Sequence, residues 1–303
     1  MRTTCIALCL TLAAGVLPSC GPGDTKTAPG QKRVVSCSPA TTRMLFDMGF
    51  GEQVVGVTKF CKLPAGQTRP RIVDALSVNT EAMLAVRPDV IFSQVDPSKF
   101  RGVTDADPHV KIVHLSIESL GDIPKAMLAI GRELGREQAA RKKTDEFEAT
   151  VEAVRRSVAH LAKKRVAFVM GTARPTAAGA GTFVSDMITA AGGVNVGSEI
   201  PGPTIWKPTQ AEEIIRVRPE VLLCQISPGK EADARNYWLQ WKDIPAAMAG
   251  QVYVVSDPAW SIPSPHLADL LPKLAKMIHP GLPPASQPST ASGRRPITGG
   301  GGS

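Results

Sequence analysis

The side chains that could do chemistry in this sequence lie in loops after predicted strands, and they suit binding better than catalysis. At Ser38, a predicted helix start offers backbone amides to an anionic or carbonyl group, although a simple helix cap explains this residue equally well. Trp206 and Trp260 lie in Pro-rich loops and offer broad faces to a large, flat, partly apolar ligand, with core packing as the alternative. A solvated loop is the alternative for Gln94 and Asp96. The candidate ligand-binding residues are Ser38, Pro39, Phe60, Cys61, Gln94, Asp96, Thr182, Phe183, Trp206, Asp257, Trp260 and His266.

Sequence motifs of enzymes and metal sites give little support to a catalytic function. Gly179-Ala-Gly181 lacks the further glycine and lysine of a phosphate-binding loop. The chain contains no Gly-x-Ser-x-Gly or His-Glu-x-x-His segment. The spacing of the histidines supports no transition-metal site. We therefore expect no enzymatic activity and no metal or cofactor that belongs to the protein itself.

Two segments of the chain resemble each other and carry a second pair of candidate residues. Residues 81–97 and 212–228 align without a gap and share Glu, Val-Arg-Pro, Val, Gln and Pro at constant offsets. This repeat predicts two similar lobes. Glu81 and Glu212 begin the two copies, at the exposed start of a short helix. Compensation of the helix dipole alone would explain them, but matching positions on two related lobes also suit docking on a two-fold symmetric partner.

The elements that must position these residues alternate between strand and helix, which predicts an α/β fold with two parallel-sheet, Rossmann-like lobes. Most of the predicted strands are apolar on both faces, as expected for a sheet covered on each side. The predicted strands span residues 33–37, 54–57, 90–93, 111–115, 165–170, 221–224 and 252–255. The predicted helices span residues 40–48, 80–86, 123–134, 183–191, 211–217, 237–248 and 266–277.

One long helix is predicted between the lobes, over residues 137–164. Its apolar positions recur at steps of three and four, which places them on one side of a helix, while charged residues fill the rest. About 27 residues at about 1.5 Å each would form a rod of about 40 Å. The apolar positions are Ala140, Thr144, Phe147, Val151, Val154, Val158 and Leu161.

The amino terminus resembles a bacterial lipoprotein signal. An apolar run over residues 5–16 is too short for a confident membrane span, and Leu17-Pro-Ser-Cys20 resembles a lipobox in which Cys20 becomes lipidated. An ordinary cleaved signal with an incidental cysteine is the alternative. The sequence then divides into a signal peptide (1–19), a tether (20–31), an N-terminal lobe (32–135), a connecting helix (136–163), a C-terminal lobe (164–280) and a disordered tail (281–303).

The composition and charge of the chain argue against a nucleic-acid partner. The 303 residues are 43% hydrophobic, and the net charge of +8 is dispersed among both signs along the chain. Because no basic patch alternates with aromatic residues, we expect no nucleic-acid partner. The mature chain has an odd number of cysteines besides Cys20, so one disulfide is possible and spacing does not select it.

These features together resemble the ABC-importer substrate-binding proteins of the ferric-siderophore, cobalamin and haem type, in which one long helix joins two lobes. The Cys61 loop and the Pro-Ser-Pro segment look most like cobalamin-binding members. The similarity covers about residues 32–280. The segments that carry it are Arg33-Val-Val-Ser-Cys-Ser-Pro-Ala-Thr41, Val55-Gly-Val-Thr58 with Cys61 and Pro64, the two Glu-containing repeats, Ala191-Gly-Gly-Val-Asn195, Ile200-Pro-Gly-Pro203 and Pro263-Ser-Pro-His-Leu-Ala268.

The resemblance implies an extracytoplasmic, lipid-anchored monomer that binds a metal chelate between its lobes and closes only slightly. Cobalamin or another corrinoid is the first expected cargo, a ferric siderophore the second and haem the third. The resemblance also implies that Glu81 and Glu212 meet arginines of an ABC permease, which works with an ATPase. His266 stands where the family commonly has arginine. A metal-tetrapyrrole enzyme or chelatase, and a ligand-sensing receptor on the same fold, are the alternatives.

Overall fold

The computed structural model describes residues 30–73, 78–202 and 204–283. The predicted signal peptide, the lipidation site Cys20, most of the tether and the tail from residue 284 lie outside these residues. Within the described part of the chain, no helix combines the length and apolar character needed to cross a membrane.

The N-terminal lobe is built on a five-stranded sheet with the order β3-β2-β1-β4-β5, and every neighbouring pair is parallel. Alternate residues of the strands pack to opposite faces. Val34 and Phe92 belong to the buried cluster that includes residues of α1 and α4, while Val35 and Ile91 belong to the cluster that includes residues of α2 and α3. The elements are β1 (Val34–Ser36), α1 (Pro39–Asp47), β2 (Val54–Thr58), β3 (Arg71–Val73), α2 (Thr80–Ala85), β4 (Val90–Ser93), α3 (Arg101–Ala106), β5 (Lys111–His114) and α4 (Asp122–Glu133).

The C-terminal lobe has a mixed sheet with the order β11-β10-β6-β7-β9, and β8 also pairs with β6. Its centre is parallel, as predicted, but β7 runs antiparallel to both β6 and β9. The predicted parallel sheet is confirmed at the centre of this lobe but does not extend to this edge, because the five residues between β6 and β7 are too few for a crossover helix. The elements are β6 (Lys164–Met170), β7 (Thr176–Ala178), α6 (Phe183–Ala190), β8 (Gly193–Asn195), β9 (Trp206–Pro208), α7 (Ala211–Arg216), β10 (Val221–Gln225), α8 (Glu231–Leu239), α9 (Pro245–Met248), β11 (Val252–Val255) and α10 (Leu267–Ile278).

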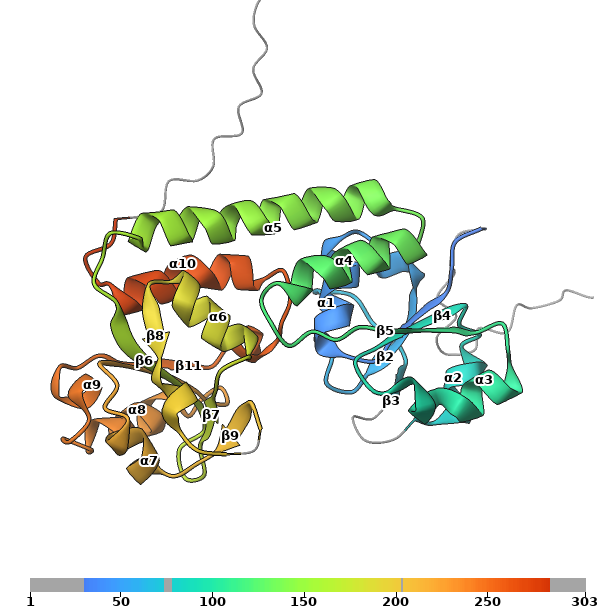
Figure 1. The fold of residues 1–303 in the computed structure, drawn as a ribbon. Coiled ribbons are helices and arrows are strands. Elements are labelled where there is room, and N and C mark those ends of the chain that lie inside the picture. Colours follow the sequence, from blue (N-terminus) through green and yellow to red (C-terminus); the bar gives the residue numbers. More distant parts are fainter. Residues whose placement is uncertain (1–29, 74–77, 203, 284–303) are drawn as a thin grey trace, which may run out of the picture.

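The connecting helix α5 (Glu137–Val158) lies across both lobes (Figure 1). Six of the seven predicted apolar positions, from Ala140 to Val158, are buried in this helix, as the periodicity predicts. The predicted end at Lys164 is wrong. The chain turns after Val158, where the Leu161 amide donates to the Val158 carbonyl (3.0 Å), and Lys164 already begins β6. Leu161 still packs against the core, so the apolar pattern continues past the end of the helix.

A second correction concerns the predicted helix over residues 237–248, which is two helices, α8 and α9. Pro245 takes the first position of α9, where its missing amide proton is not needed and its fixed φ favours a new start. The short elements β3, α3, β7, β8 and β9 were not predicted.

Candidate functional site

The N-terminal candidates lie at the carboxyl ends of three adjacent strands, β2, β1 and β4. Ser38 is buried and caps α1, because its Oγ accepts the Thr41 amide proton (3.1 Å) and donates to Thr41 Oγ1 (2.8 Å). Pro39 is half-buried at the first position of that helix. Cys61 is buried as well, with its Sγ 3.1 Å from the hydroxyl groups of Thr42 and Thr58. These contacts hold the loop after β2 against the start of α1.

Two other N-terminal candidates reach solvent. Phe60 is 53% exposed, with the Lys59 ammonium 5.1 Å from the centre of its ring. Asp96 is exposed and accepts the Ser98 amide proton at 2.7 Å, and hydrogen bonds from the Ser98 side chain and amide lower its pKa. Gln94 is half-buried. Among these residues, Phe60 therefore offers the largest apolar surface to a ligand.

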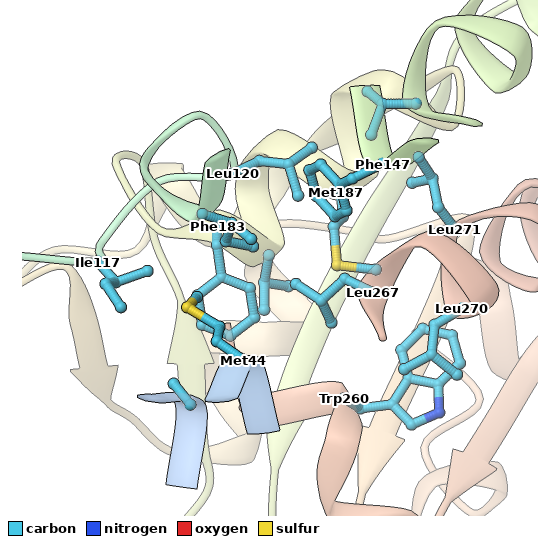
Figure 2. Packing of buried hydrophobic residues seen from close by; sticks show 14 of the residues in the cluster. Met44, Ile117, Leu120, Phe147, Phe183, Met187, Trp260, Leu267, Leu270 and Leu271 are labelled. Carbon is cyan, nitrogen blue, oxygen red and sulfur yellow. The ribbon is translucent and has the colours of Figure 1, made fainter. Parts of the chain in front are cut away.

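The C-terminal candidates around α6 pack against one another. Thr182 is fully buried and caps α6, accepting the Ser185 amide proton at 3.1 Å. The rings of Phe183 and Trp206 lie 5.9 Å apart at 59°. Phe183 is buried in the cluster that also contains Met44 of α1, so it belongs to the core that the two lobes share (Figure 2). Trp206 is half-buried and keeps part of its indole exposed, and its neighbour Ile205, which the sequence analysis did not select, is exposed too.

The remaining candidates lie around the loop between β11 and α10. Asp257 is exposed and caps the 3-10 helix η4 (Pro258–Ser261), accepting the Ala259 amide proton at 3.0 Å. His266 is half-buried between two carboxylates, with Nδ1 3.0 Å from Asp269 Oδ2 and Nε2 4.0 Å from Asp257 Oδ2. In the described part of the chain, no cluster of three or more His, Cys, Asp and Glu side chains could hold a metal ion.

Trp260 does not present its face as the sequence analysis expected. Only 4% of the residue is exposed, and η4 turns the indole into the core of the C-terminal lobe. There it lines the same small apolar space as Val184 of α6, Leu223 of β10 and Leu274 of α10. Trp260 belongs to the same buried cluster as Leu270, part of which Figure 2 shows. In this structure Trp260 is a core residue, and Trp206 is the tryptophan that a ligand could reach.

Two cavities flank the connecting helix. One of about 320 Å³ lies between α1, α5 and the start of α10, and His266 lines it. The other, of about 560 Å³, lies between α4, α5 and α6. Beside it the Leu120 amide donates to Asp186 Oδ2 at 2.9 Å, a hydrogen bond that joins the two lobes. Asp186 was not among the residues predicted from sequence, because an acid in the first turn of a helix is also the usual sign of dipole compensation.

Glu81 and Glu212 are exposed in the first turns of α2 and α7. Neither carboxylate forms an ion pair within the described residues. Figure 1 shows α2 and α7 on the side of the molecule away from α5. Both helices are followed by an arginine with a left-handed backbone, Arg87 (φ 46°) and Arg218 (φ 44°). The sequence repeat is thus a structural repeat, in which each glutamate begins the same helix, turn and strand.

A matched set of hydrogen bonds fixes each copy to its sheet. In the N-terminal lobe the Arg33 amide donates to Asp89 Oδ2 (2.6 Å), and the guanidinium donates to the Val86 carbonyl (3.0 Å). In the C-terminal lobe the Arg165 amide donates to Glu220 Oε2 (2.9 Å), and the guanidinium donates to the carbonyl group of Val217 (2.7 Å). The amide hydrogen bond is the main cause that lowers the pKa of Glu220.

The cysteines Cys37, Cys61 and Cys224 are all free and buried. Burial and the neighbouring Cys61 raise the pKa of Cys37 to about 12, and burial raises the pKa of Cys224 to about 11. Because only the thiolate reacts, we expect a disulfide reagent at pH 8 to label these thiols in urea but not in the native protein. Prompt labelling of the native chain would contradict the buried positions.

Comparison with known proteins agrees with this architecture. The family profile described as "Periplasmic binding protein" matches residues 34–259. A vitamin B12-binding protein of Pectobacterium carotovorum is 25% identical over 211 residues, which cover 68% of this chain and 76% of the relative. An uncharacterized ABC transporter substrate-binding lipoprotein of Bacillus subtilis, YvrC, is 22% identical and covers 82% of this chain and 80% of the relative.

Solved structures share the fold. The apo form of the periplasmic heme-binding protein RhuT from Roseiflexus sp. RS-1 has a TM-score of 0.70 at 25% identity, covering 83% of this chain and 99% of that one. The periplasmic vitamin B12-binding protein BtuF of Vibrio cholerae has a TM-score of 0.72 at 17% identity, covering 82% and 96%. With its profile match and two lobes joined by one long helix, the chain belongs to the periplasmic binding protein family.

Proposed function

We propose that this chain is the substrate-binding lipoprotein of an ABC importer for a metal chelate, with cobalamin or another corrinoid as the first candidate cargo. A ferric siderophore is the second candidate and haem the third. The observation that carries the proposal is the similarity to vitamin B12-binding proteins over about two thirds of the chain. The relatives are binding proteins, and this chain is a binding protein and not an enzyme.

The exposed apolar side chains support a large, partly apolar cargo. Phe60 in the N-terminal lobe, and Ile205 with Trp206 in the C-terminal lobe, leave apolar surface in contact with water. Contact with the face of a macrocycle would remove that surface from water at about 25 cal/mol per Å². In this proposal the buried residues Ser38, Cys61 and Thr182 do not touch the cargo. They hold the ligand-binding loops in place through the hydrogen bonds described above.

In the same proposal, Cys20 carries the lipid anchor and the body works outside the cytoplasmic membrane, as expected of this family. Glu81 and Glu212 receive the arginines of a permease. The equivalent Arg33 and Arg165 hydrogen bonds support this role, because they hold both glutamate-bearing helices in the same relation to their sheets.

The test is a titration of the mature chain, with Cys20 replaced by serine, against cyanocobalamin, a ferric hydroxamate, a ferric catecholate and haem. We expect cyanocobalamin to bind with 1:1 stoichiometry in calorimetry and to raise the unfolding free energy. At a hundred times the dissociation constant the increase should be about 2.7 kcal/mol. If only another of these chelates binds tightly, that chelate becomes the proposed cargo in place of cobalamin. If none of them binds, the ligand belongs to a different chemical class.

A further inference from the structure

The body of the protein begins at a strongly basic end. Lys32 precedes β1, and its Nζ donates to the Glu133 carbonyl and to Glu133 Oε1, both at 2.8 Å. The chain therefore enters the fold beside the C-terminus of α4 and the turn that leads into α5. Six cations gather at this end, which we call the basic end, and they are Lys32, Lys111, Arg132, Arg136, Arg141 and Lys142.

The acids at this end are too few to neutralise these cations. Glu133 lies between Lys32 (2.8 Å) and Lys111 (2.5 Å). Glu137 is likewise shared by two arginines, with Arg132 at 3.9 Å and Arg141 at 3.8 Å. At the same edge of the sheet, Asp89 accepts the Arg33 amide proton. Asp145, one turn beyond Arg141 and Lys142 on α5, is a further exposed acid. With Arg33 included, seven cations still outnumber these four acids, so the basic end keeps a net positive charge.

Two of the cations are free to meet a partner. Arg136, in the turn between α4 and α5, and Lys142, in the second turn of α5, are exposed. Neither forms an ion pair among the described residues. An exposed guanidinium and ammonium on a rigid helix hairpin suit a surface of clustered anions better than a single acidic side chain.

The chain outside the structure indicates which anionic surface this is. In the proposed lipoprotein, eleven residues separate the lipidated Cys20 from Lys32, and a fully extended chain of that length spans at most about 40 Å. The tether thus allows the basic end to reach the headgroups of the membrane that holds the lipid. Each cation near an anionic bilayer is attracted by about 1 kcal/mol within a Debye length of about 10 Å.

We propose that the basic end binds anionic phospholipid headgroups, so that the waiting receptor lies with its α4–α5 turn against the membrane. This proposal rests on the lipoprotein function proposed above. Figure 1 shows the α4–α5 turn on the opposite side of the molecule from α2 and α7, which carry Glu81 and Glu212. Docking on a permease through those helices would then require the body to turn away from the lipid surface.

The test uses the mature chain with Cys20 replaced by serine, so that lipidation plays no part. Co-sedimentation is measured with vesicles of phosphatidylcholine alone and with vesicles that also contain phosphatidylglycerol. We expect binding to the anionic vesicles only. In the pair Arg136→Glu and Lys142→Glu, binding should fall by tenfold or more, because about fivefold is lost for each cation removed. Binding should also fall with added salt.

A matched control separates a defined surface from the overall charge of the chain. Lys242→Glu and Lys273→Glu make the same change of charge at exposed positions of the C-terminal lobe, and this pair should keep binding within about twofold. Equal losses in both pairs, or no preference of the parent chain for anionic vesicles, would overturn the proposal. Cyanocobalamin binding, measured without vesicles, tests the proposed function separately.

Discussion

Replacing Glu81 and Glu212 together with arginine is expected to abolish transporter-dependent uptake of the chelate while its affinity for the isolated protein stays within about twofold. Both glutamates are exposed, and both begin helices held by equivalent arginine hydrogen bonds. If permease arginines face these carboxylates, each substitution exchanges an attraction for a repulsion. Like charges brought together at an interface cost several kcal/mol, which would reduce complex formation by orders of magnitude.

Uptake of labelled chelate is measured in cells that depend on this chain, and affinity is measured on the purified protein. Each single substitution should leave partial uptake, because one lobe still docks. The control pair Glu52→Arg and Glu148→Arg makes the same change of charge at two other exposed positions. Glu52 lies in the 3-10 turn (Gly51–Gln53) that precedes β2, and Glu148 lies on α5. It should transport normally. Full uptake by the Glu81 and Glu212 pair would remove the docking role.

The structural repeat illustrates what could be predicted from sequence. The shared Val-Arg-Pro segments predicted related lobes, and the structure shows the same left-handed arginine in each, Arg87 and Arg218. The apolar seam of α5 was equally clear, because one helix face packs on both lobes along its whole length. Repeats and periodicity extend over many residues, so they can be recognised even where single residues fit both a helix and a strand.

The strands β7 and β9, at the edge of the C-terminal sheet, could not be predicted from a repeat or from periodicity. The strand β7 has three small residues, Thr176, Ala177 and Ala178, and β9 includes a proline. Neither has the length or the β-branched character that marks a strand in sequence. Their pairing joins segments about thirty residues apart, so it depends on tertiary packing that a local pattern does not contain.

The candidate site shows a different limit. Ser38, Thr182, Asp96 and Asp257 were selected as polar residues after strands, and each proves to cap a helix. A helix cap and a ligand-binding group require the same short polar side chain before a helix. Their direct contact with a ligand stays a prediction. Phe60, which is exposed, and Trp206, which is half-buried, could be separated from the buried candidates only once burial was known.

The two tryptophans of the candidate list should respond to substitution in opposite ways. Trp260→Ala removes a ring that is 4% exposed and packed among Val184, Leu223 and Leu274, so the unfolding free energy should fall by about 3–5 kcal/mol in urea titrations. Trp206→Ala removes a half-buried residue whose ring is in tilted contact with Phe183 at the edge of the lobe. Because part of this residue is already in contact with water, the loss of stability should be smaller, about 1–2 kcal/mol from the lost burial and ring contact.

The two variants should also differ in their affinity for the chelate. Calorimetry measures this affinity without relying on tryptophan fluorescence. In the proposed function Trp206 covers part of the cargo, so Trp206→Ala should weaken binding by about tenfold, as expected for the loss of about 1.4 kcal/mol of contact. The folded fraction of Trp260→Ala should bind with nearly the parent affinity. If the results were reversed, with Trp260→Ala stable but unable to bind, the indole of Trp260 would have to leave the core to meet the ligand, and the lobe would rearrange on binding.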